Sequence, residues 1–275
     1  MLRLNLETII QPLNRTLLAL LCIITAANEA LSQDTLWIFR YPSAANVKVM
    51  VDCTISKEMQ AFRYSYGLRS STSSQQDVEG FFLDVNSLIK TISSPDLWRG
   101  TRSATRQAVM WFSRDSTKDI LPGQNLDGFR ILCNGLPGIA TFYVEGFVPV
   151  PEFPYGQTPD SVIGNDVFEN SFKGKTLAPK DPPVHFVHLA FLDTLISYKH
   201  QAYNLGWITN KGILNSLDQK LDNARKQLER GNNKAAKNVL EAFIDEVEAQ
   251  KGKHLSSEAY ALLKFNAEYL ISKLE

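Results

Sequence analysis

The stretch "NKAAKNVLEAFIDEVEAQKG" (233–252) has the clearest periodicity in the chain. Its apolar residues recur every three or four positions, which places them on one stripe of an α-helix. They are Ala236, Val239, Leu240, Phe243, Ile244 and Val247. Gly252 follows at a position where helices commonly end. Asp245, Glu246 and Glu248 fall on the other side, where we expect a solvated face with lysine neighbours and not catalytic carboxylates.

The same period extends over the whole C-terminal third of the chain. It predicts further helices over 184–206, 212–231 and 255–274, with Gly231 as a stop and Ser256 as an N-cap. Short connections make neighbouring helices antiparallel. Residues 184–275 are therefore expected to form a three- or four-helix antiparallel bundle.

The region before it has the pattern of β structure. Short runs rich in Val, Ile, Phe, Tyr and Trp alternate with turns that contain Pro, Gly and Asn. The expected strands are 46–55, 61–70, 80–88, 108–113, 128–134 and 139–148. No long amphipathic helix separates them, so 33–150 is predicted to be an antiparallel, Ig-like β-sandwich of six to eight strands. Residues 149–183 hold seven of the twelve prolines. We therefore expect a Pro-rich linker over 151–183, with a possible edge strand near 160–168.

Residues 1–32 have the pattern of a signal peptide. Arg3 and Arg15 flank the start of an apolar stretch at 16–27, and Ala30 and Ser32 are small residues that suit a cut before Gln33. About twelve apolar residues fall short of the roughly twenty that a membrane span needs. The pattern predicts export to the cell surface, the periplasm or the medium, without a stable span in the mature chain. An uncleaved anchor or a buried helix is the alternative.

Two cysteines remain after that cut, Cys53 and Cys133, and both share the alternation of inward-facing residues. They are a candidate disulfide, which would contribute about 4 kcal/mol by closing a long loop. Two buried free thiols are the alternative, because the sequence does not supply the Cα separation.

The charge balance and the motifs argue against most enzymes. Lys plus Arg equals Asp plus Glu at 29 each, and no basic run indicates a nucleic-acid partner. No metalloprotease, hydrolase-nucleophile or phosphate-loop motif occurs. His185 and His188 are one helical turn apart, but we interpret them as polar positions beside two prolines and not as metal ligands. We therefore expect no catalytic residues, metal or cofactor.

Trp98 is the candidate ligand-binding residue. It follows "SSPDL" (93–97), so we expect it in an exposed loop, where its ring could stack on a sugar or anchor a protein. Core packing is the alternative for Trp98, and it is the interpretation we favour for Trp111 and Tyr66, which fit an inward-facing set.

The helical region also resembles a known family. Gly212-Ile213, Ser216-Leu217, Phe243-Ile244 and Gly252-Lys253 occur in the order typical of the FIMAH-type helical domain found C-terminally in many bacterial extracellular proteins. The resemblance implies an accessory module without a catalytic constellation. The β region looks like sandwich domains of bacterial exported proteins, which brings no assigned activity.

These observations favour a secreted or cell-surface, non-catalytic binding protein. It would contact an envelope polysaccharide or another surface protein through the β-sandwich. An extracellular hydrolase or lyase is the alternative, and it predicts acid and base side chains converging in one pocket. A structural spacer without a concave surface is a third possibility.

Overall fold

The computed structural model describes residues 38–40, 43–149, 161–163 and 167–274. It divides into two compact units. In the smaller unit, β1 (Ile38–Arg40) pairs in parallel with β10 (Ser161–Ile163). The larger unit holds the sheets and helices described below. The expected signal peptide and its cut before Gln33 lie outside the described residues.

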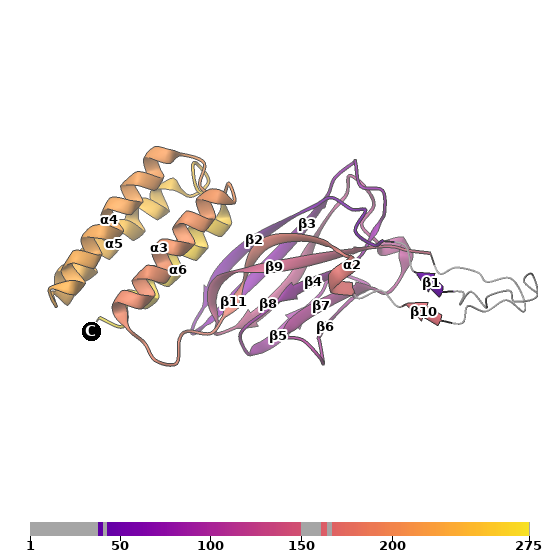
Figure 1. Cartoon of the computed structure of the whole chain (residues 1–275), viewed down its shortest axis with the longest axis horizontal. Helices are drawn as coiled ribbons and strands as arrows, with labels where there is room; N and C mark the ends of the chain where they lie inside the picture. The colour runs from indigo at the N-terminus through magenta and orange to yellow at the C-terminus, as the bar shows by residue number, and fades with distance from the viewer. Residues whose placement is uncertain (1–37, 41–42, 150–160, 164–166, 275) are drawn as a thin grey trace, which may run out of the picture. The chain divides into compact units, whose positions relative to one another are not determined.

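Two antiparallel sheets form the first part of the larger unit, as Figure 1 shows. One has five strands in the order β11-β9-β4-β7-β6, and the other has four in the order β2-β3-β8-β5. The strands are β2 (Val49–Glu58), β3 (Ala61–Ser70), β4 (Val78–Asp84), β5 (Ile89–Ser93), β6 (Trp98–Arg102), β7 (Ala108–Ser113), β8 (Asn125–Cys133), β9 (Leu136–Gly146) and β11 (Phe172–Lys180). The predicted antiparallel sandwich is confirmed.

Aromatic rings fill the space between the two sheets. Trp111 is fully buried and stacks on Phe81 with ring centroids 5.1 Å apart. Tyr66 and Phe129 of the opposite sheet contact the same indole at 6.2 and 5.8 Å. The Trp111 Nε1–H donates to the carbonyl of Ser93 at 3.0 Å, so it also ties β7 to the edge strand β5. The inward orientation expected for Trp111 and Tyr66 is confirmed.

Trp98 is part of this core, so the expectation that it is exposed is wrong. Only 5% of the residue is accessible, its ring lies edge-on to Phe129 at 5.1 Å, and its Nε1–H donates to the Lys118 carbonyl at 3.1 Å. The reason is local, because Leu97 has a left-handed backbone with φ of 57°. This turn ends the loop at Leu97, so β6 begins at Trp98 with the indole facing inward.

The candidate disulfide between Cys53 and Cys133 is not formed, and both cysteines are buried free thiols. They lie on β2 and β8, on either side of β3, opposite Tyr66 and Phe62 respectively. An intervening strand and a stagger of four residues put them beyond the reach of a bridge. Burial raises the pKa of both thiols, that of Cys133 to about 11, so neither is a ready nucleophile.

The expected linker also needs correction, because its last third belongs to the sandwich. Strand β11 pairs with β9 along nine residues, from Phe172 opposite Val144 to Lys180 opposite Leu136. A short helix, α2 (Val167–Asn170), precedes it. Pro179 is tolerated because β11 is an edge strand of its sheet, where a missing N–H need not break a ladder. The strand expected near 160–168 is β10, which pairs with β1 instead.

Four helices form the predicted bundle: α3 (His188–Asn204), α4 (Lys211–Glu229), α5 (Asn233–Gln250) and α6 (Ser257–Ile271). Figure 1 shows them side by side. The Asn210, Asn232 and Ser256 side chains accept from backbone N–H groups in the first turns of α4, α5 and α6. Gly231 and Gly252 have φ of 70° and 71°, the left-handed conformation in which helices often end.

Two of the three acids selected in the 233–252 stretch, Glu246 and Glu248, have the lysine neighbours expected of them. Glu246 is 2.5 Å from the Lys220 ammonium, and Glu248 pairs with Lys264 of α6. Phe243 and Val247 are fully buried against the other helices. This stretch is therefore scaffold, as its periodicity predicted.

Helix α6 joins the bundle to the sandwich. The Cys53 N–H on the edge strand β2 donates to Oε1 of Glu258 at 2.6 Å, and Glu258 is only 6% exposed. The Asn266 amide donates to the Pro137 carbonyl at 2.9 Å, and Phe265 packs on Phe62 at 5.1 Å. The helices therefore cover one open edge of the four-stranded sheet.

Glu79 lies in β4 at an irregularity of its pairing with β9, between Val78 and Gly80, and its carboxylate should make stability depend on pH. Burial, with repulsion from Glu145 and Asp119, raises the pKa of Glu79 to about 7. Because the pKa of Glu79 is higher in the folded chain than in the unfolded chain, protonated Glu79 contributes fully to stability below about pH 4.5. This contribution is lost as the pH rises through 7. We expect Glu79→Gln to increase the free energy of unfolding by about 1 kcal/mol at pH 8. This is less than the roughly 3 kcal/mol of the full shift, because water partly screens the side chain.

Urea unfolding at pH 4 and pH 8 measures this effect. Glu241→Gln, at an exposed position on α5, is the control and should change stability little at either pH. An equal effect of Glu79→Gln at both pH values would show that ionisation of Glu79 is not its cause.

Candidate binding groove at the end of the sandwich

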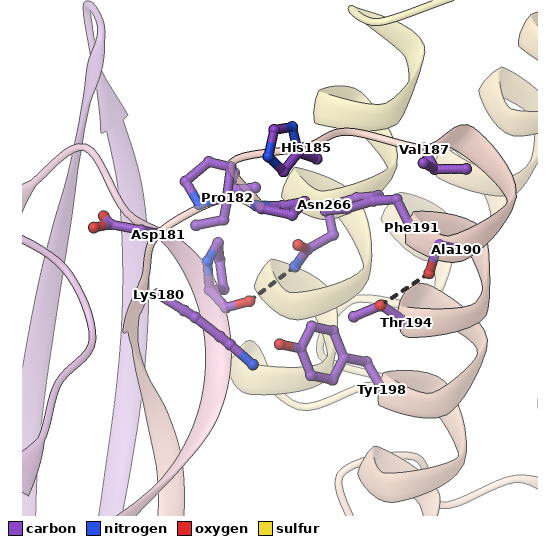
Figure 2. A pocket seen from close by; sticks show the side chains of 13 residues that line it. Lys180, Asp181, Pro182, His185, Val187, Ala190, Phe191, Thr194, Tyr198 and Asn266 are labelled. Carbon is purple, nitrogen blue, oxygen red and sulfur yellow. Dashed lines mark hydrogen bonds between the residues drawn. The ribbon is translucent and has the colours of Figure 1, made fainter.

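A pocket of about 260 Å³ lies where the sandwich meets the helices, and we call it the junction pocket (Figure 2). Its walls come from the start of β9, the segment that connects β11 to α3, the first three turns of α3, and one residue of α6. They are mostly apolar. The lining residues are Leu136, Pro137, Lys180, Asp181, Pro182, Pro183, His185, Val187, Ala190, Phe191, Thr194, Tyr198 and Asn266.

Local sequence explains how these walls are held. The Asp181 N–H donates to the Asn86 carbonyl at 2.6 Å, and the prolines that follow fix φ and prevent β11 from continuing. Asn266 donates to the carbonyls of Pro137 and Leu262, so it joins β9 to α6 at the base of the pocket. A Cβ at Gly138 would lie 3.2 Å from the Tyr198 hydroxyl and 3.2 Å from Cβ of Lys180. The glycine therefore permits their close approach.

Polar groups lie around the pocket without converging on one point. Figure 2 shows Lys180 extending towards Tyr198, while Asp181 points away from the pocket and His185 lies on the opposite rim. His188 does not line the pocket, and its Nε2 is 2.7 Å from the Lys273 carbonyl. His185 and His188, which are one helical turn apart in the sequence, therefore have separate environments.

Two further hollows continue from the junction pocket along the end of the sandwich. The middle hollow has a volume of about 440 Å³ and shares Lys180 with the junction pocket. The outer hollow has a volume of about 350 Å³ and shares Val85, Asn86, Arg106 and Gln107 with the middle one. We call the three together the end groove. Its middle and outer parts combine apolar side chains with amides, hydroxyls and cations, so they are more polar than the junction pocket.

Arg106 organises the middle of the end groove. Its guanidinium binds Asp84 with an Nε–Oδ1 distance of 3.1 Å and donates to the Tyr143 hydroxyl at 2.6 Å. Tyr143 in turn donates to Asp84 at 3.1 Å, and the Phe168 ring centroid is 4.2 Å from Cζ of Arg106. Burial and the Asp84 carboxylate raise the pKa of Tyr143. Asp84 is thus fully engaged and unavailable as a free acid or base.

Three other cations of the end groove lack a carboxylate partner within the described part of the chain. Arg102 lines the outer hollow, Lys175 the middle hollow, and Lys180 both the middle hollow and the junction pocket. All three are exposed. Within the described ranges, one side-chain hydrogen bond is formed by these three cations, from the Lys175 ammonium to the Thr141 hydroxyl at 2.9 Å. Their charges are available to a ligand.

The described ranges contain no group of three His, Cys, Asp or Glu side chains that could hold a metal ion. None of the helices between residues 167 and 274 is long and apolar enough to cross a membrane.

Sequence reasoning missed the end groove because its walls come from segments far apart in the chain. They include the turn after β4, the loop before β7, β9, β11 and α3. The run Lys180-Asp181-Pro182-Pro183 was the available signal, since a charged pair before two prolines ends a strand abruptly. Its interpretation as linker concealed the strand that precedes it.

Comparisons with known proteins place one of the two folded regions in a family. No curated protein matches the chain. An uncharacterized protein from Nocardia farcinica, whose crystal structure has an immunoglobulin-like fold, is similar in structure with a TM-score of 0.29 and 11% sequence identity. The match covers 48% of this chain and 98% of that one. Residues 198–272, from the last two turns of α3 to the end of α6, match the FIMAH domain, which confirms the family resemblance of the helical region.

Proposed function

We propose that this chain is a secreted or cell-surface, non-catalytic binding protein that holds a stretch of envelope polysaccharide in the end groove. The observation that carries the proposal is the continuity of the three hollows, which share lining residues from the junction pocket to the outer hollow. Such a row of hollows suits an extended polymer better than a compact small molecule. The signal-like pattern of residues 1–32 supports the exported location.

The chemistry of the walls fits a sugar chain. Pro183 and Val187, both exposed, offer apolar surface to the C–H faces of sugar rings in the junction pocket. The amides of Asn86 and Gln107 and the hydroxyls of Ser87, Ser103 and Thr141 beyond it can donate to and accept from sugar hydroxyls. A pocket with apolar walls and a few directed polar groups is the usual form of a ligand site.

The arrangement of acids and bases supports binding without catalysis. A general acid or base must come within hydrogen-bond reach of the reacting atom. Asp84 is held by Arg106 and Tyr143, while Asp181 points away from the junction pocket and His185 lies on its far rim. No pair of these groups flanks a common point, as a glycosidase would require.

A bulky side chain placed in the junction pocket tests the proposal. Ala190 is an exposed helical residue that lines the pocket, so Ala190→Trp should fill it without disturbing the core. We expect about tenfold or greater loss of affinity for the bound glycan, the equivalent of 1.4 kcal/mol. Ala242→Trp is the matched control, because Ala242 is an exposed alanine on α5, away from the pocket lining.

Binding is measured with the purified protein on a glycan array and by calorimetry with bacterial wall polysaccharides. Equal loss in both tryptophan variants would remove the junction pocket from the site. Failure of the wild-type protein to bind any polysaccharide would overturn the proposed function. Release of new reducing ends from a bound polysaccharide would show that the protein is a hydrolase instead.

A further inference from the structure

We infer that the polymer held in the end groove is an acidic polysaccharide, whose negative groups are bound by Arg102, Lys175 and Lys180. This inference rests on the proposed function and specifies its ligand. The ligand class is a sugar chain or sugar-like chain that carries regularly placed carboxylates or phosphates. Guanidinium and ammonium groups bind such anions by charge-assisted hydrogen bonds.

These three cations form no ion pair among the described residues, unlike several other cations of the sandwich. Arg63 pairs with Glu58, and Arg69 pairs with both Asp52 and Asp127. The whole chain carries equal numbers of basic and acidic residues, 29 of each. Unpaired cations in the end groove are therefore not the result of a generally basic protein. They form a local excess of positive charge that attracts an anionic ligand.

The cations are spread along the end groove instead of meeting at one point. Lys180 lies where the junction pocket meets the middle hollow, Lys175 lines the middle hollow, and Arg102 lines the outer hollow. An anion in the middle hollow could contact both Lys175 and Lys180, whereas Arg102 lines the outer hollow. A polymer with several negative groups can contact all three, which gains affinity from each contact.

Positive charge continues beyond the outer hollow onto the adjoining edges of the two sheets. Residues 89–118 contain six basic residues and two acidic ones. Lys90 on β5 and Arg99 on β6 are exposed and form no ion pair among the described residues. Gly100 and Ile92 bring these two strands together, since a Cβ at Gly100 would lie 2.5 Å from Ile92. Further cations therefore lie on β5 and β6, the two strands that also supply Ile89 and Arg102 to the outer hollow.

The acids near the end groove do not cancel this charge. Asp84 is neutralised by Arg106, with which it forms an ion pair of 3.1 Å. Asp181 lines the junction pocket and the outer hollow, and it forms no ion pair in the described part of the chain. Three unpaired cations and one unpaired carboxylate leave the end groove positive.

The test compares two triple variants of the full chain with the same change of net charge. One carries Arg102→Gln, Lys175→Gln and Lys180→Gln in the end groove. The control carries Lys226→Gln, Arg230→Gln and Lys234→Gln, three exposed cations of α4, its C-cap and α5. All six positions are on the surface, and circular dichroism and thermal melting establish that both variants fold. A charge-conserving variant with Arg102→Lys, Lys175→Arg and Lys180→Arg should retain binding.

The probes are polygalacturonate, poly(glycerol phosphate), neutral dextran and single-stranded DNA, with dissociation constants measured at low and high NaCl. We expect the groove triple variant to bind the acidic glycans about tenfold more weakly, and the control to change by less than about twofold. Wild-type binding should weaken by about tenfold in high salt, because exposed charges are screened. Preference for polygalacturonate or for poly(glycerol phosphate) then assigns carboxylate or phosphate as the negative group.

Three outcomes would overturn the inference, and they differ in whether they also contradict the proposed function. Binding of dextran by the wild type as tightly as polygalacturonate, with no loss of either in the groove variant, keeps the proposed function but shows that the groove does not select negative charge. Binding of no polysaccharide at all removes both the proposed function and the inference. Binding of DNA as tightly as polygalacturonate, with the same loss in the groove variant, shows that the groove selects charge and not a sugar chain.

Discussion

Replacing Trp111 by alanine is expected to lower the free energy of unfolding by about 3–5 kcal/mol, the range for loss of a large buried aromatic side chain. The indole is fully buried, stacks on Phe81 at 5.1 Å and contacts both sheets. The substitution also leaves the Ser93 carbonyl without the indole N–H that binds it at 3.0 Å. Edge strand β5 would then lose its side-chain tie to β7.

Urea unfolding monitored by far-UV circular dichroism measures this loss. Met110→Ala is the control, since Met110 is the neighbouring residue on β7 and faces outward, partly exposed. It should cost less than about 1 kcal/mol. A comparable loss in both variants would show that Trp111 is not a special anchor of the sandwich.

Removing Asp218 is expected to cost about 2–3 kcal/mol at neutral pH, because it leaves the cation of Lys199 buried without its ion-pair partner. Lys199 on α3 is completely inaccessible and pairs with Asp218 of α4. Burial, opposed by attraction from Asp222, lowers the pKa of Lys199 to about 8. This loss of unfolding free energy is smaller than the largest losses for buried ion pairs, because the Asp218 side chain is 31% exposed.

The matched variants are Asp218→Ala, Lys199→Met and the double variant, compared by urea unfolding. Lys199→Met removes the buried charge and keeps most of the volume, so it should change stability by less than about 1 kcal/mol and should rescue Asp218→Ala. The unfolded chain keeps the Lys199 proton up to about pH 10.5, whereas the folded chain releases it near 8. The wild type and Asp218→Ala should therefore both gain stability as the pH rises from 8 towards 10. The cost of Asp218→Ala should be larger at pH 6, where Lys199 is charged in the folded wild type, than at pH 9, where it has lost its proton. An equal cost at the two pH values, or a cost that Lys199→Met fails to rescue, would contradict the electrostatic explanation.

The helices were predictable because each one combines a 3.6-residue period with explicit end signals. The helix expected over 233–252 is α5 at Asn233–Gln250, and the glycines that were expected to end α4 and α5 do follow them. Strands β3 and β7 have the predicted bounds because their runs of apolar and aromatic residues are bordered by turns. Local sequence decides such elements with little help from distant residues.

Sequence reasoning missed three strands of the sandwich, of which β5 and β11 pair with strands far away in the chain, whereas β6 pairs with the next strand, β7. Strands β5, β6 and β11 lie at sheet edges, so only part of each is buried and their apolar alternation is weak. Strand β11 contains Gly174 and Pro179, which favour an interpretation as loop. Only its register with β9 shows that it belongs to the sandwich.

The end groove could not be predicted for the same reason, and the one residue selected as a contact, Trp98, is in the core. Its loop-like surroundings predicted exposure, whereas the left-handed turn at Leu97 aims its ring inward. Unpaired cations such as Lys180 have no signature in a sequence, because their lack of partners depends on the packing of other segments. The sequence did indicate where the helices follow the sandwich, because the prolines give way abruptly to a helical period.

The contact between Glu258 and the Cys53 N–H also affects how the protein is made. Strand β2 is synthesised some two hundred residues before the helix that covers its edge, and the carboxylate that satisfies its backbone arrives on α6. Until then, the growing chain carries an open strand edge that can pair with another chain. Successful biogenesis therefore depends on keeping nascent molecules apart until α6 has emerged.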